Sequence, residues 1–262
     1  MGHEQHGDEA HDIANRFVTA RRTGEGLREY PGRIPATLGQ AYAIQNAAIA
    51  LDGRPVLGWK VGKIDPPFEG ANRLAGPIFE SVVAADGAIP DMPIFAAGFG
   101  AAEAEYLLRI GTAPPAGKLE FTIDEAKALI DAVHVGIEVA SSPLPMINDL
   151  GPAVTISDFG NNNGLVIGAA IPDWRSVDIH GWPVELDING ERIGAARAAD
   201  MLDGPFGAAR FLFELMAARG IALTPGQWIS TGAVTGVHRV LPGDTVAARF
   251  DGRLTVRCRI IA

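Results

Sequence analysis

The sequence predicts an α+β protein in which a small helical N-terminal layer precedes a mostly antiparallel system of strands. Three observations favour this class. Helical spacing dominates residues 10–52, two turn signals typical of β-hairpins lie in the last third, and 32 glycines and 18 prolines punctuate the 262 residues. The expected division is a helical region at 1–56 and a strand-rich domain at 57–262.

The N-terminal layer is expected to contain two helices. The first covers residues 10–28, where apolar residues recur at a ragged helical spacing: Ile13, Phe17, Val18 and Leu27. After a Pro-Gly break, Thr37 and Gln40 form a capping box that opens a second helix. That helix should end near Leu51, with Gly53 as its stop.

The first twelve residues, MGHEQHGDEAHD, are polar and acidic. They lack the apolar core of a secretory signal. The three histidines His3, His6 and His11 have two interpretations, a metal-binding tail or a frayed terminus, and the frayed terminus is favoured.

The middle of the chain predicts strands around one short helix. Strands are expected at 56–62, bounded by glycines, and at 101–108, where AAEAEYLL alternates. A capping box of Thr122 and Glu125 predicts a helix through about Ala132, followed by a strand at 134–139.

The last third predicts two hairpins and a helix. Asn189-Gly190 and Asp251-Gly252 are type I′ turn signals between apolar runs. A helix is expected at 205–219 with Gly220 as its stop, and a short strand at 227–229 precedes a glycine-containing loop.

Composition excludes several classes. The net charge is −9, from 22 basic and 31 acidic residues, and basic residues never cluster beyond a pair, so nucleic acid is not an expected partner. No apolar run reaches the length of a membrane span. The single Cys258 cannot form an internal disulfide, which fits a cytoplasmic protein, and it is expected to be buried in the last strand.

Three carboxylates are candidates for a cation site. Glu103 and Glu105 share one face of a predicted strand, which is either solvated or occupied by a cation. Glu138 lies among small and apolar residues, where it is either ion-paired or a third ligand. A hard ion such as Mg²⁺ suits such a set of oxygens. His134 shares the face of Glu138 and is interpreted as structural.

Other polar segments have two interpretations each. Lys60, in GWKVGK, is either a surface residue or a buried acid–base group. The loop at 230–236 either is a plain turn or offers backbone N–H groups to an anion. The segment 158–164, DFGNNNG, suits a turn and could line a polar pocket.

These segments, in this order, resemble the 2-keto-4-pentenoate hydratase / 4-oxalocrotonate decarboxylase branch of the fumarylacetoacetate hydrolase superfamily. The segments that carry the resemblance are AYAIQNA, GWKVGK, AAEAEYLLRI, HVGIEVASS, DFGNNNGLVIG, GIALTPGQWISTGAVTG and LPGDTVAARFDG. The resemblance implies a rolled mixed β-sheet with peripheral helices, and a homo-oligomer. A complex with a related decarboxylase or hydratase is a further expectation. It also implies Mg²⁺ or Mn²⁺ at Glu103, Glu105 and Glu138, with Lys60 as the family lysine.

The expected activity is hydration of a small 2-hydroxy-2,4-dienoate in aromatic catabolism. Decarboxylation of a 2-oxo acid, C–C hydrolysis of an acylpyruvate and a non-catalytic subunit are the alternatives. The predicted substrate-binding residues are Lys60, Asn161, Thr231 and Gly232. Relatives of the hydratase type often show an acidic residue next to Met where this chain reads GPIFES, so Glu80 is the catalytic stand-in beside Lys60.

Overall fold

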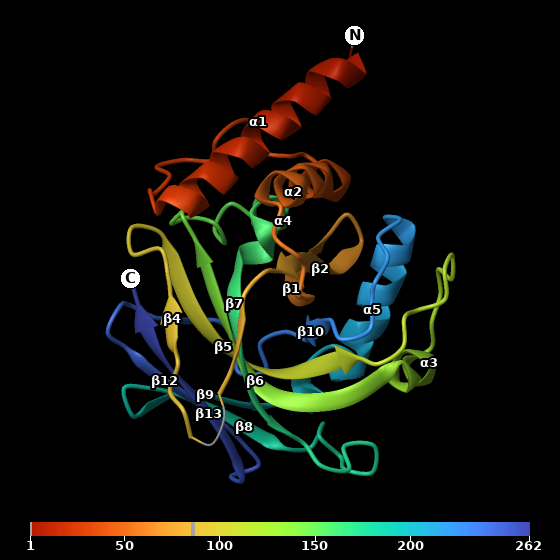
Figure 1. Cartoon of the computed structure of the whole chain (residues 1–262), viewed down its shortest axis with the longest axis vertical. Helices are drawn as coiled ribbons and strands as arrows, with labels where there is room; N and C mark the ends of the chain where they lie inside the picture. Colours follow the sequence, from red (N-terminus) through yellow and green to blue (C-terminus); the bar gives the residue numbers. More distant parts are fainter. Residues whose placement is uncertain (1, 85–86) are drawn as a thin grey trace.

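Two β-sheets roll against each other, and helices cover them (Figure 1). The computed structural model describes residues 2–84 and 87–262. The helices are α1 (Gly2–Thr23), α2 (Leu38–Asp52), α3 (Ile123–Ala128), α4 (Pro152–Ser157) and α5 (Gly204–Ala218), with 3-10 turns at Phe159–Asn161 and Ala198–Asp200. The α+β class with mixed sheets is therefore confirmed.

The larger sheet carries eight strands in the order β2-β1-β10-β5-β6-β7-β3, with β11 paired to β5. Their bounds are β1 Gly58–Phe68, β2 Ala71–Ile78, β3 Ser81–Val83, β5 Phe99–Ile110, β6 Ile130–Ser142, β7 Asn162–Ala170, β10 Trp228–Ser230 and β11 His238–Arg239. The β1–β10 and β3–β7 pairs are parallel, and the other pairs are antiparallel. Strand β10, from the last third of the chain, lies between β1 and β5.

The smaller sheet has the order β4-β13-β12-β8-β9. Its strands are β4 Asp91–Pro93, β8 Pro183–Ile188, β9 Glu191–Arg197, β12 Thr245–Phe250 and β13 Leu254–Ile261. Both predicted hairpin turns are confirmed, since Asn189-Gly190 and Asp251-Gly252 all have positive φ, as a type I′ turn requires. Cys258 is buried in β13, as expected.

The main core lies between the two sheets and α5. Alternation along β5 sends Ala104 and Tyr106 into this core, where Tyr106 meets Phe250 of β12 edge-on at a ring-centroid distance of 5.2 Å. The other face of β5 therefore presents Glu103 and Glu105 away from the main core.

A second apolar cluster joins the N-terminal helices to the larger sheet. Ile13 and Phe17 of α1 and Ile44 of α2 pack with Phe99 of β5 and Ala140 of β6. In Figure 1, α1 lies across α2 at one end of the molecule. The helical layer thus rests on the ends of the two strands that carry the acidic residues.

Three helix boundaries differ from the predictions. Helix α1 ends at Thr23 because Gly24 adopts φ 73°, and the N–H of Leu27 donates instead to the carbonyl of Pro143 at 2.8 Å. Its start at Gly2 means that the histidine segment is helical rather than frayed, since acidic residues favour a helix N-terminus. The side chain of His11 is exposed, and those of His3 and His6 lie outside the described part.

Helix α3 is shorter than expected. It ends at Ala128 because β6 starts at Ile130, which pairs with Ile110 of β5. Cross-strand pairing overrides the helical pattern there. Among the described residues, no helix has both the length and the apolar composition needed to cross a membrane.

Candidate active site

Three glutamates from two neighbouring strands meet on the outer face of the larger sheet. Glu103 and Glu105 lie on β5 at the two-residue spacing that puts them on one face, and Glu138 of β6 is the register partner of Glu103. One carboxylate oxygen of each lies within 4.8 Å of the others. The antiparallel register therefore turns an E-x-E pattern and a distant Glu into one cluster.

Each of the two deepest carboxylates has one oxygen held by the protein and one without a partner. Oε2 of Glu105 accepts hydrogen bonds from the hydroxyl of Ser230 and, at 2.9 Å, from the N–H of Gly232. Oε1 of Glu138 accepts from Nδ2 of Asn162 at 2.9 Å. The remaining oxygens, Glu105 Oε1 and Glu138 Oε2, are buried with no hydrogen-bond partner among the described residues.

These unpartnered oxygens fit a divalent cation. A buried polar atom without a partner is costly, and carboxylate oxygens are the ligands that hard divalent ions prefer. Glu103 completes the donor set, with an exposed fraction of only 4%. The donor chemistry and the burial are thus those of a metal centre.

Lys60 lies beside the cluster because β1 runs parallel to β10 and sets Lys60 against Ser230. Its Nζ is 3.5 Å from Oε1 of Glu138, and its side chain is 7% exposed. The aliphatic stem lies against Gly160, where a Cβ would come within 3.0 Å of Lys60 Cδ. Glycine at this position therefore leaves room for the buried lysine.

The charges of the cluster shift one another. Burial alone would lower the pKa of Lys60, but the surrounding carboxylates, Glu138 first, raise it above its ordinary value. Burial raises the pKa of Glu103 to about 7 against the lowering effect of Lys60. Burial, with the negative charges of Glu138 and Glu103, raises the pKa of Glu105. One lysine does not neutralise three carboxylates.

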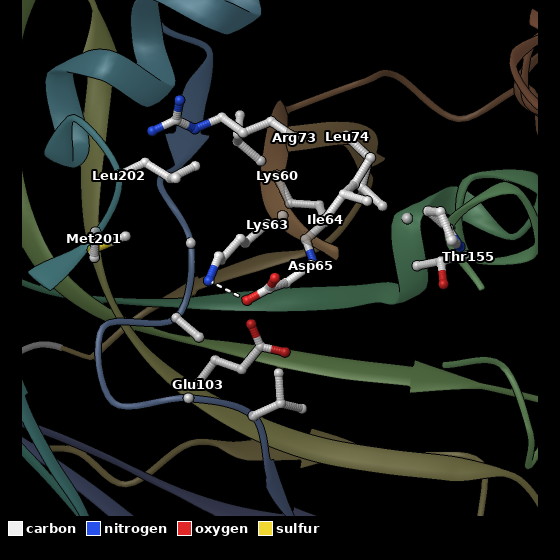
Figure 2. Close-up of a pocket in the computed structure, with 18 of the residues that line it drawn as sticks. Lys60, Lys63, Ile64, Asp65, Arg73, Leu74, Glu103, Thr155, Met201 and Leu202 are labelled. Carbon is white, nitrogen blue, oxygen red and sulfur yellow. Dashed lines mark hydrogen bonds and ion pairs between the residues drawn. The ribbon is translucent and has the colours of Figure 1, made fainter. Parts of the chain in front are cut away.

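A cavity of about 1090 Å³ opens in front of the cluster. Its lining includes Lys60, Glu103, Asn161, Thr231 and Gly232. Figure 2 shows Glu103 pointing into this space, with Met201 and Leu202 along one side and Leu74 on another. The structure therefore brings the three glutamates, Lys60 and the predicted substrate-binding residues around one cavity or directly behind its wall.

The predicted turn within 158–164 has an unusual backbone. Phe159, Gly160 and Asn161 have consecutive positive φ values of 55°, 64° and 67°. Left-handed backbone at a residue such as Phe159 is disfavoured and clusters at functional sites. The turn places the amide of Asn161 at the cavity, and its Oδ1 is buried with no hydrogen-bond partner in the part of the chain that the structure describes.

Glu80 is the predicted site residue that the structure does not bring to the others. Its side chain is 63% exposed, and its Oε1 accepts a hydrogen bond from Nη1 of Arg54 at 2.7 Å. It lines a second cavity, of about 760 Å³, instead of the one in front of the glutamates. Strand β2 ends at Ile78, and the connection to β3 directs Glu80 away from Lys60.

Sequence reasoning missed two residues that hold the acidic cluster. Ser230 and Asn162 each donate to a glutamate whose second oxygen is free. The sequence indicated Ser230 only through its position at the end of β10, the strand that pairs with β1. Nothing in the run Asn161-Asn162-Asn163 distinguishes the middle residue, since only the β7–β6 register selects it.

Comparison with known proteins defines the class to which this fold and site belong. The sequence model of the family described as "Fumarylacetoacetate (FAA) hydrolase C-terminal" matches residues 78–261. The chain is therefore a member of the fumarylacetoacetate hydrolase family. Within it, the chain is 30% identical to a 2-keto-4-pentenoate hydratase of Burkholderia vietnamiensis over 255 residues, or 94% of this chain and 95% of the relative. It is also 27% identical to a 4-oxalocrotonate decarboxylase of Pseudomonas putida, a match that spans about half of that relative, 52%. These relatives confirm the predicted branch.

Solved structures support the fold assignment. The 4-oxalocrotonate decarboxylase from Pseudomonas putida G7, complexed with magnesium and adipate, superposes with a TM-score of 0.82 over 97% of this chain and 98% of that one, at 21% identity. A fumarylpyruvate hydrolase from Pseudomonas aeruginosa in complex with Mn²⁺ and pyruvate gives a TM-score of 0.58 at 17% identity, over 78% and 88%. The rolled architecture implied by the resemblance is therefore confirmed.

Proposed function

We propose that this protein is a divalent-metal-dependent hydratase of a small 2-hydroxy-2,4-dienoate, which it converts to a 4-hydroxy-2-oxo acid. The carrying observation is the buried cluster of three glutamates, two of them with one free oxygen each, beside Lys60. The hydratase relative, which aligns over nearly its whole length, supports hydration over the other reactions of the branch.

Glu103, Glu105 and Glu138 would hold the metal, with Mg²⁺ or Mn²⁺ as the proposed ions. Structures of relatives with magnesium and with Mn²⁺ support this choice. When bound, the ion supplies Lewis-acid stabilisation of the negative charge that develops on the 2-oxygen of the substrate. Three carboxylates supply fewer oxygens than such an ion binds, so substrate oxygens and water would provide the remaining ligands.

Lys60 has two roles in this proposal. Its ammonium group remains protonated at neutral pH because the glutamates raise its pKa, so it neutralises the carboxylate of the incoming substrate. It also lines the cavity with Glu103, where it would relay the proton that the 2-hydroxyl group loses to the terminal carbon of the diene and so stay protonated itself. Water would then add its hydroxyl group at C4 and its remaining proton at C3.

Asn161, Thr231 and Gly232 line the cavity. The amide of Asn161 would orient the substrate. The Thr231 hydroxyl donates to the carbonyl of Tyr106 and the Gly232 N–H to Glu105, so these two would shape the wall of the binding site.

The direct test is turnover of 2-hydroxypenta-2,4-dienoate, followed by the loss of its ultraviolet absorbance. We expect turnover with Mg²⁺ or Mn²⁺, loss of turnover after EDTA, and recovery on adding metal back. The Lys60→Met variant should keep the metal site and lose turnover. Unchanged turnover after complete chelation contradicts the proposal.

Decarboxylation of a 2-oxo acid is the second candidate, supported by the decarboxylase relatives and their fold. The same charge stabilisation would serve this reaction. Release of CO₂ from 4-oxalocrotonate, measured by coupled assay, distinguishes it from hydration. A purified chain that turns over neither substrate, or whose turnover is unchanged in Glu103→Ala so that it does not come from this site, would instead indicate a non-catalytic subunit.

Assembly is a separate part of the proposal. Homo-oligomerisation, and association with a related decarboxylase or hydratase, remain predictions from the resemblance. Light scattering of the purified chain, alone and mixed with such a partner, tests both.

A further inference from the structure

The side chain of Arg21 joins helix α1 to the buried start of the left-handed turn. Its Nε and Nη2 donate to the two carboxylate oxygens of Asp158, at 2.5 and 3.0 Å. Asp158 is fully buried and directly precedes Phe159, while the Arg21 side chain is 7% exposed. Such a two-point contact depends on the planar fork of arginine, which lysine lacks.

The same guanidinium also holds the far end of the turn. Its Nη1 donates to the carbonyl oxygen of Asn162 at 3.2 Å and to Oδ1 of Asn163 at 3.3 Å. Its Nη2 donates to the carbonyl oxygen of Ser141, at the end of β6, at 3.0 Å. The Arg21 side chain therefore hydrogen-bonds to the residues on both sides of the left-handed run.

That run needs support from its surroundings. Left-handed backbone is disfavoured for a non-glycine residue, and the run contains two such residues, Phe159 and Asn161. The Phe159 ring lies 5.0 Å from the Arg21 guanidinium carbon and 5.0 Å, edge-on, from the ring of Phe79. Both charged and aromatic contacts of Arg21 thus favour the unusual conformation.

The turn and the residue after it reach the proposed site at two places. Asn161 presents an unpartnered Oδ1 at the cavity, and Nδ2 of Asn162 donates to Oε1 of Glu138 at 2.9 Å. We propose that Arg21 is a positioning residue of the active site, which fixes this turn and, through Asn162, orients the Glu138 carboxylate. The inference rests on the proposed function in taking Glu138 as a metal ligand.

Arg22 provides a matched control for Arg21. It is the next residue of α1, it is exposed, and it donates to the carbonyl oxygens of Leu51 and Asp52 at the end of α2. Arg22→Ala therefore removes an equally large side chain and charge from the same helix without touching the turn. Removing a residue that orients a metal ligand typically costs 10–100-fold in metal affinity.

The first measurement is the dissociation constant for Mn²⁺ by electron paramagnetic resonance, with folding monitored by circular dichroism. We expect Arg21→Ala to weaken Mn²⁺ binding by about 10–100-fold and Arg22→Ala by less than about twofold. Arg21→Lys keeps the charge and loses the fork, so it should resemble Arg21→Ala. If Arg21→Ala does not fold, Arg21→Lys carries the test.

Chemical rescue separates positioning from general stability. Arg21 also lines the second, surface cavity, so methylguanidinium ion can enter from that side in Arg21→Ala. We expect it to restore much of the Mn²⁺ affinity of this variant and to leave Glu138→Gln unchanged. In a double-mutant cycle, Arg21→Ala and Asn162→Ala should be markedly non-additive, because both act on Glu138 by one route.

Two outcomes would overturn the inference, and a third separates it from the proposed function. Folded Arg21 variants that bind Mn²⁺ like the wild type would overturn it. So would additive losses in the cycle, since Arg21 would then act independently of Asn162. A wild-type protein that fails to bind Mn²⁺ would instead overturn the proposed function first, and with it the role assigned to Arg21.

Discussion

The two sheets each bury acidic side chains, and they treat them in opposite ways. In the smaller sheet, Asp187 of β8 accepts a hydrogen bond from Nη1 of Arg249 and lies 3.6 Å from Nε of Arg192. In the larger sheet, three glutamates share one lysine. The first arrangement balances two arginines against two carboxylates, since Arg192 also pairs with Glu185, whereas the second is short of positive charge.

This difference distinguishes a structural ion pair from a ligand site. The arginines beside Asp187 are partly exposed, and their charges match those of Asp187 and Glu185. The glutamate cluster is buried, and Ser230 and Asn162 orient two of its carboxylates without neutralising them. Hydrogen bonds that aim like charges at a common point have no evident structural purpose, but they preorganise a cation site.

The largest effect that the comparison predicts concerns metal affinity. Glu105→Gln removes one charged ligand while keeping its size, so Mn²⁺ affinity should fall by more than about 100-fold, the upper end for losing an orienting partner alone. Turnover should fall with it. Calorimetry with Mn²⁺ measures the affinity, and Asp187→Asn is the control that should bind Mn²⁺ like the wild type.

The same two variants should change the stability of the metal-free protein in opposite directions. Glu105→Gln relieves repulsion within the cluster and should raise the free energy of unfolding at pH 8 by on the order of 1 kcal/mol. Asp187→Asn leaves Arg249 without its carboxylate partner and should lower it by about 2 kcal/mol, since the pair is only partly buried. Urea unfolding with EDTA measures both. Equal signs for the two variants would contradict the comparison.

The three glutamates could be predicted from the sequence better than the residues that hold them in place. Two-residue spacing placed Glu103 and Glu105 on one face, and the apolar context of Glu138 marked it as unusual. These are properties of single strands, which local patterns predict. The contact between Arg21 and Asp158 spans 137 positions and depends on how α1 packs on the sheet, which no local pattern encodes.

The predicted end of the helix that follows Thr122 was wrong for a related reason. Helical spacing continued past Ala128, but pairing of β6 with β5 determined where the helix stopped. The left-handed run at Phe159 was predicted only as a turn, because its conformation depends on Arg21 and Phe79 from elsewhere in the chain.

A smaller effect concerns the pH dependence of the metal-free protein. The pKa of Glu103 is raised to about 7 in the folded chain, chiefly by burial, and that of Glu105 is raised as well. The folded chain therefore holds protons that the unfolded chain releases, and this contribution to stability is lost as the pH rises from about 4.5 through 7. The pKa of Lys60 is raised from an already high value, so Lys60 stays protonated across this window.

We therefore expect the melting temperature in EDTA to fall between pH 5 and pH 8, and saturating Mg²⁺ to reduce that fall. Glu105→Gln should flatten the profile, whereas Asp187→Asn should leave its slope unchanged. Differential scanning fluorimetry across this range checks all three. A melting temperature that rises with pH in EDTA would mean that the cluster is not the dominant titrating group.

The smallest expected effect belongs to Glu80. Its side chain is mostly exposed and, within the described part of the chain, hydrogen-bonds with Arg54 on the surface, where such pairs contribute little. Glu80→Gln should therefore leave Mn²⁺ affinity, turnover and melting temperature close to those of the wild type, in contrast to Glu105→Gln. A selective loss of turnover, with metal binding intact, would mean that the connection between β2 and β3 rearranges during catalysis and brings Glu80 to the substrate. Measuring Glu80→Gln beside Glu105→Gln thus tests whether turnover depends on the buried carboxylates alone.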